Sequence, residues 1–162
     1  MNRRDALKLT ATAAPALAQQ STVPAWKPRL FDQHQADTVA TLAERIIPAT
    51  DTPGAMAAGV HRYIDTLLAD GENTQRVRFL EGLAWLDGVS HRDHSAPFVR
   101  LPVDKQNSVL EGLAGSSGPG EAFFRLAKQL TVRVYYATQT GFNELNKGGR
   151  AAGFGCKHPE HA

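Results

Sequence analysis

Cysteine is almost absent from this chain, and its scarcity excludes several cofactors. Cys156 is the single cysteine, so no disulfide can form within one chain. Covalent haem attachment needs two cysteines before a histidine, and an iron–sulfur cluster needs several thiolates, so the sequence excludes both. A lone thiol in an oxidising compartment invites an intermolecular bond, unless it is buried and stays reduced.

The chain also lacks long apolar runs and a strong excess of one charge. No segment approaches the ~20 apolar residues that a membrane-spanning helix requires. The formal net charge is +2, and Arg76, Arg78 and Arg125 are scattered among acidic residues instead of forming a basic stripe. We therefore expect no nucleic-acid binding, and membrane contact only through partners.

The N-terminus is arranged like an export signal. Adjacent Arg3 and Arg4, with Leu7 behind them, resemble the bacterial twin-arginine signal. A short Ala- and Thr-rich stretch follows, and Ala16 and Ala18 supply the small-x-small pattern of a cleavage site. Cleavage after Ala18 would release a periplasmic protein of zero formal charge. The alternative interpretation is an amphipathic first helix of a cytosolic protein.

Recognisable catalytic motifs are missing. The glycines at 118–120 are not followed by the third glycine of a dinucleotide loop, because the chain continues into Phe123. Ser116 and Ser117 lack the Gly-x-Ser-x-Gly spacing of a nucleophile elbow. We predict no catalytic residue. The carboxylates considered, whose spacing brings no two together, are Asp51, Asp65, Glu81 and Asp104.

Histidine is the residue type that clusters. His91 and His94 lie three positions apart, while Cys156, His158 and His161 gather near the C-terminal end. These ligand types suit zinc or copper. Both groups fall in segments predicted to be irregular, and a metal site needs a scaffold that fixes its geometry, so we predict no metal ligand. The alternative is a stand-alone periplasmic metal-binding protein that uses Cys156, His158 and His161.

Apolar residues at spacings of three and four predict about five helices. Asp32 begins the first helix, with Gln35 completing a capping box, and Pro48 ends it. Thr52 begins the second helix, with a proline at its first position, and Gly71 ends it.

The remaining helices are predicted from the same spacing. The third begins at Asn73 and stops near Gly88, and polar residues 90–95 form a loop. The fourth begins near Pro102, and the fifth, over about 121–136, has the broadest apolar face and is predicted to be central. Side chains expected to face the core include Val39, Leu42, Ile46, Val60, Tyr63, Ile64, Leu68, Val77, Leu83, Val103, Val109, Leu113, Phe123, Leu130 and Val134.

The predicted fold is therefore all-α, an irregular bundle with long Gly/Pro-rich connections and an extended C-terminal tail. We expect a twin-arginine signal peptide at 1–18, a linker at 19–30, one helical domain at 31–140, and the tail at 141–162. A chain of this size buries enough surface for one core.

Several pieces of the chain carry a family resemblance. They are the twin-arginine start, LAERIIPATDTPGA at 42–55 with Gly59 and Val60, LAKQLTVRVYYATQTG at 126–141, and the closing Gly155, Cys156 and His158. Together they resemble the gluconate 2-dehydrogenase subunit 3 family, the small or gamma subunit of bacterial membrane-bound sugar and sugar-acid dehydrogenases.

The resemblance implies an accessory subunit that is inactive alone. Such a subunit pairs with a large FAD-dependent dehydrogenase of the glucose–methanol–choline type, often beside a cytochrome c subunit. FAD and the catalytic base would belong to the partner, so no cofactor is expected in this chain. The small subunit would stabilise its partner and escort it through the twin-arginine translocase. The substrate stays open among gluconate, glucose, glycosides and other polyols.

The resemblance also implies which residues contact the large subunit, including a disulfide from the single cysteine. The candidate contacts are Pro48, Thr50, Asp51, Pro53, Gly54, Tyr135, Tyr136 and Cys156. The alternative for the first five is that they only turn the chain between two helices, as such residues ordinarily do.

Overall fold

The computed structural model describes residues 26–115 and 117–146, and all of their regular structure is helical. The predicted all-α class is confirmed. The predicted signal peptide at 1–18 and the tail from 147 onward lie outside the described residues. The elements in chain order are α1 (Gln33–Ile46), α2 (Val60–Asp70), α3 (Asn73–His94), the 3₁₀ helix η1 (Phe98–Arg100), α4 (Val103–Ala114), α5 (Pro119–Ala137) and α6 (Gln139–Leu145).

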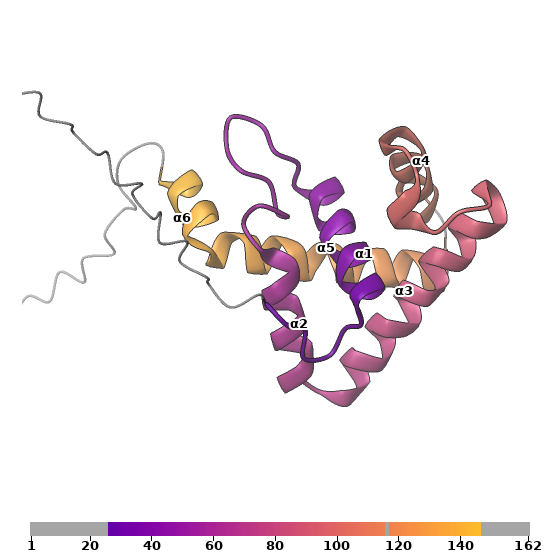
Figure 1. The fold of residues 1–162 in the computed structure, drawn as a ribbon, viewed down its shortest axis with the longest axis horizontal. Helices are drawn as coiled ribbons and strands as arrows, with labels where there is room; N and C mark the ends of the chain where they lie inside the picture. The colour runs from indigo at the N-terminus through magenta and orange to yellow at the C-terminus, as the bar shows by residue number, and fades with distance from the viewer. Residues whose placement is uncertain (1–25, 116, 147–162) are drawn as a thin grey trace, which may run out of the picture.

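Helix α5 is the central helix, as the sequence predicts. It contacts each of the other five α-helices of the described part and runs along the long axis of the molecule (Figure 1). Phe123, Leu130 and Val134 on this helix are buried in one continuous apolar core. At the crossing with α3, the ring of Phe123 lies against Gly82, where a Cβ atom would come within 2.0 Å of the ring. The two helices can approach this closely because residue 82 has no side chain.

Helix α1 begins and ends where its sequence indicates. The Asp32 carboxylate accepts a hydrogen bond from the Gln35 amide, and the Gln35 side chain accepts one from the Asp32 amide, which completes the predicted capping box. The helix stops at Ile46, two residues before Pro48. Its inner face, including Val39 and Leu42, is buried in the core.

Helix α2 begins later than predicted. Thr52 does not cap it, because residues 51–59 form a loop and the helix starts at Val60. Gly59 precedes it with φ 73°, a left-handed conformation that glycine adopts without steric cost. The predicted end near Gly71 is confirmed, since the last helical residue is Asp70.

Helix α3 is longer than predicted. It continues through Gly88 to His94, so residues 90–95 are not a loop; the chain turns only at Ser95, which has φ 57°. Ser90 is buried and its hydroxyl donates to the Leu86 carbonyl, which satisfies this polar group inside the helix. At the other end the N-cap is Glu72, and the predicted cap Asn73 is the first helical residue.

Three side chains predicted to face the core are exposed instead. They are Tyr63 on α2, Val77 on α3 and Val103 at the start of α4. Each lies at the edge of an otherwise correct apolar face, so helical spacing alone did not separate it from its buried neighbours.

The sequence did not predict α6. Residues from Gly141 onward were assigned to an extended tail, but residues up to Leu145 form this short helix. Thr138 caps it by accepting a hydrogen bond from the Gly141 amide. A Cβ atom at residue 141 would lie 2.2 Å from the Tyr135 carbonyl oxygen, so only glycine permits this contact between α5 and α6.

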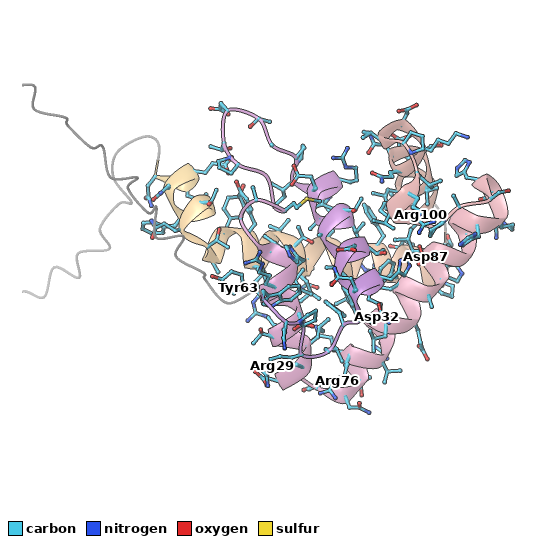
Figure 2. The ribbon with its side chains drawn as sticks, in the orientation of Figure 1. Arg29, Asp32, Tyr63, Arg76, Asp87 and Arg100 are labelled. Carbon is cyan, nitrogen blue, oxygen red and sulfur yellow. The ribbon has the colours of Figure 1, made fainter. Side chains whose placement is uncertain are left out.

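The segment before α1 is attached to α2 by a buried carboxylate. Asp65 is fully buried and accepts hydrogen bonds from the amides of Arg29, Leu30 and Phe31, at 2.7, 3.0 and 2.9 Å. The Arg29 guanidinium forms two hydrogen bonds with Asp70 one turn further along α2. Figure 2 shows Arg29 beside this end of α2. Asp65 therefore has a structural role and is not a free catalytic acid.

No helix in ranges 26–115 and 117–146 is both long enough and apolar enough to cross a membrane.

Candidate functional site

The loop that joins α1 to α2, residues 47–59, is held by one carboxylate. Glu44, in the last turn of α1, accepts a hydrogen bond from the Ala49 amide at 2.9 Å and another from the Met56 amide at 2.8 Å. A further bond joins the Ala55 amide to the Ile47 carbonyl at 2.9 Å. Both ends of the loop are thus tied to the end of α1, which gives a long loop a defined shape.

Gly54 lies under this carboxylate. A Cβ atom at position 54 would be 2.4 and 2.5 Å from the two Glu44 carboxylate oxygens and 2.6 Å from the Ala49 nitrogen. Any side chain there would displace Glu44 and break the bonds that shape the loop. Position 54 therefore requires glycine because neighbouring atoms approach it closely, and not because of its backbone angles.

Tyr135 connects the loop to the C-terminal end of α5 and to α6. Its side chain is buried, and its hydroxyl lies 3.0 Å from the Pro53 carbonyl and 2.8 Å from the Glu144 carboxylate. A phenol has one hydrogen to donate, so it bonds one of these two acceptors at a time. Burial raises the pKa of Tyr135, and the hydrogen bond to Glu144 raises it further. The phenol therefore stays protonated at neutral pH, and its one donor lies within reach of both the loop and α6.

The structure places the sequence-predicted contact residues at one loop and one helix end. Pro48, Thr50, Asp51 and Pro53 are exposed on the loop. Gly54 and Tyr135 are buried, so their place is inside the fold, supporting the loop. Tyr136 is partly exposed, and its ring packs edge-on against Tyr135 with 5.2 Å between centroids. Cys156 lies outside the described residues.

The structure brings together Pro53 and Tyr135, which are 82 positions apart in the chain. Sequence reasoning placed both in the candidate set but missed the two carboxylates that complete the arrangement, Glu44 and Glu144. A signal for Glu44 was available, because an acidic residue at the end of a helix, before a proline and a glycine-containing turn, can accept the free amides of that turn. Nothing in the local sequence indicated Glu144.

The carboxylates and histidines considered for chemistry do not converge in the described part. Asp65 is occupied by backbone amides, and Glu81 and Asp104 are exposed on different helices. No group of three or more His, Cys, Asp or Glu residues within 26–115 and 117–146 is placed to hold a metal ion. His91 and His94 lie in the last turn of α3, while His158 and His161 fall outside these ranges.

The family model described as Gluconate 2-dehydrogenase subunit 3 matches residues 33–154, which is most of the chain. The chain belongs to this family. The match begins at the first residue of α1, includes the loop at 47–59 and α6, and continues eight residues beyond the described part. No curated protein and no solved structure matches the chain.

Membership in the gluconate 2-dehydrogenase subunit 3 family indicates the role of the chain that carries the candidate site. The family is that of a dehydrogenase subunit, so the chain is an accessory subunit type that associates with a dehydrogenase complex. An exposed loop whose shape is fixed by bonds inside the fold is preorganised, so little conformational entropy is lost when another molecule contacts it.

Proposed function

We propose that this chain is the non-catalytic small subunit of a periplasmic FAD-dependent sugar, sugar-acid or glycoside dehydrogenase of the glucose–methanol–choline type. It stabilises the large catalytic subunit and escorts it through the twin-arginine translocase. FAD belongs to the large subunit, and a cytochrome c subunit accepts the electrons in complexes that contain one.

The family match over residues 33–154 carries this proposal. Two further observations support it. The start of the sequence, with Arg3 and Arg4, resembles a twin-arginine signal, and that route transports proteins that have already folded. The polar groups of the described site hold the backbone of a loop and join it to the end of α5, so the loop has a defined shape before a partner binds.

The test is purification of the full chain, with a C-terminal tag, from the periplasm of its native host. We expect a co-purifying protein that mass spectrometry identifies as a flavoprotein dehydrogenase, together with a flavin absorbance band. The complex should oxidise a sugar or sugar acid with an artificial electron acceptor, whereas the chain expressed alone should not. A colourless chain that emerges alone, or that oxidises sugar by itself, would contradict the proposal; bound zinc or copper would then favour the metal-binding alternative.

The export role needs a separate control. Replacing both arginines with lysine, in the variant Arg3→Lys/Arg4→Lys, keeps the charge and removes the paired guanidinium groups. We expect both this chain and the flavoprotein to stay in the cytoplasm of cells that express the variant. If the flavoprotein still reached the periplasm, the escort role would be wrong and the subunit role would stand.

A further inference from the structure

Large apolar side chains are exposed around α6 and the loop. In the described part, Leu145 is 66% exposed, Phe142 55%, Met56 43% and Tyr136 38%, whereas the other exposed large apolar side chains are spread over α2, α3 and α4: Tyr63, Val77, Trp85 and Val103. Phe142 and Leu145 are three residues apart on α6, so they lie on one face of that helix. Exposed apolar side chains that gather in one region mark surfaces that bind other proteins. We call this region the loop–α6 surface: residues 48–57, Tyr136 and α6.

The same region is nearly free of charge. Residues 46–60 and 134–146 contain only two charged side chains, Asp51 and Glu144, and both are acidic. The half-buried carboxylate of Glu44, which accepts from the Ala49 and Met56 amides of the loop, adds a third acidic group. Across the whole chain, 21% of residues are charged. The centres of protein interfaces are depleted of charge in this way and enriched in aromatic residues and methionine. Since these charges are all negative, the complementary surface is apolar with basic side chains at its rim.

We propose that the large dehydrogenase subunit docks on the loop–α6 surface, with Phe142 and Leu145 inserted into an apolar pocket of that subunit. This inference rests on the proposed function, which supplies the partner. It assigns the binding surface to one end of the molecule, where α6 lies, and not to the end formed by α3 and α4 (Figure 1).

Tyr135 is the positioning residue of this surface. Helix α6 has seven residues, too few for an isolated helix to be stable in water. Its position depends on the Thr138 cap, on the close contact at Gly141, and on the bond between Tyr135 and Glu144. The same hydroxyl reaches Pro53, so one side chain sets the loop and α6 relative to each other before the partner arrives. Such preorganisation lowers the entropic cost of binding.

The test measures binding of variants to the purified flavoprotein dehydrogenase identified by co-purification. The variants are Phe142→Asp, Leu145→Asp and their combination, in the full chain. Val103→Asp is the matched control, because Val103 is 50% exposed and lies on α4, away from α6. All these side chains are exposed, so the substitutions leave the core intact, which circular dichroism would check. We expect Kd to rise about 30-fold or more for each α6 variant, and to stay within about twofold for the control.

Each outcome decides a different question. If wild-type chain binds and the α6 variants bind equally well, the docking surface is wrong while the proposed function stands. If Val103→Asp weakens binding as much as the α6 variants, the surface is also wrong. If wild-type chain binds no flavoprotein, the proposed function fails and this inference fails with it.

A second variant tests the positioning role. Tyr135→Phe keeps the buried ring and removes only the hydroxyl. We expect faster hydrogen exchange at the amides of α6 and a Kd raised by about tenfold, with the exchange of α3 unchanged. Tyr63→Phe is the control, because it removes an exposed tyrosine hydroxyl on α2, outside the loop–α6 surface, and leaves the bonds of Tyr135 in place. Unchanged exchange at α6 in Tyr135→Phe would overturn the positioning role.

Discussion

Asp65 fixes the segment before α1 by accepting three backbone N–H groups while fully buried. In Asp65→Asn, one oxygen becomes an NH₂ group that faces donors. We expect the free energy of unfolding to fall by about 2 to 3 kcal/mol, because hydrogen bonds to a buried charge are lost and a donor is left without an acceptor. Chemical denaturation measures this change.

The neighbouring ion pair supplies the control for Asp65. Asp70→Asn removes the charge of this pair and one of its two bonds to the exposed Arg29 guanidinium, and exposed ion pairs contribute little to stability. We expect the unfolding curve of Asp70→Asn to stay close to that of the wild type. If both variants lowered the free energy of unfolding by the same amount, burial would not be the reason why the bonds of Asp65 are strong.

His61 makes stability depend on pH. Burial lowers the pKa of His61, and the nearby Arg62 lowers it further. Below about pH 6.5 the unfolded chain binds a proton at this residue that the folded chain resists. The free energy of unfolding should therefore fall as pH drops through this range.

The variant His61→Gln should reduce this dependence between about pH 7.5 and 5.5, measured by denaturation at each pH. His91→Gln, at an exposed position, checks that the effect belongs to residue 61. A slope unchanged in His61→Gln would contradict the assignment.

At the scale of elements, substitutions at two glycines of α3 measure the effect of packing and the effect of helix propensity separately. A Cβ atom at Gly82 would meet the Phe123 ring at 2.0 Å, whereas a Cβ atom at Gly88 would meet nothing within 4 Å. We expect Gly82→Ala to destabilise the protein by about 1 to 3 kcal/mol through overpacking. Gly88→Ala should stabilise it by about 0.5 to 1 kcal/mol, because alanine favours a helix more than glycine does. Thermal or chemical unfolding of the two variants would reveal whether the signs differ as stated.

Elements with strong local signals were predictable from the sequence. The capping box at Asp32, the proline after α1 and the broad apolar face of α5 each depend on residues close in the chain, and the structure agrees with all three. Helix α3 was cut short at Gly88 because a glycine often ends a helix. Here the glycine is on an open face, and the buried neighbours Leu86 and Val89 outweigh its low helix propensity.

Elements that depend on distant partners were not predictable. The start of α2 was misplaced because Thr52 and Pro53 resemble an N-terminal cap. Glu44 instead holds the amides of Ala49 and Met56, on either side of these two residues, and the segment between them stays a loop. Helix α6 is short, and it is held by a tyrosine hydroxyl and by a glycine contact with the preceding helix. The same holds for the candidate site: its turn could be recognised in the sequence, whereas Glu144, which acts through a contact with Tyr135, could not.

At the scale of the whole molecule, binding of the large subunit should raise stability. A ligand that binds only the folded state, present at about 100 times its Kd, stabilises that state by about 2.7 kcal/mol. For a chain of this size we expect the thermal midpoint of the small subunit to rise by roughly 5–10 °C in the complex. Differential scanning calorimetry of the separate and mixed proteins would measure it. An unchanged midpoint at saturating partner would contradict binding to the folded state.

The central place of α5 has a consequence for the order in which the protein is made. The other α-helices pack against a helix that spans Pro119–Ala137, so α1 to α4 leave the ribosome before their common partner exists. The core cannot close during most of synthesis, and folding must finish after translation is nearly complete. A ribosome that stalls before residue 119 would release a chain with exposed apolar helix faces, which chaperones and proteases would recognise as unfinished.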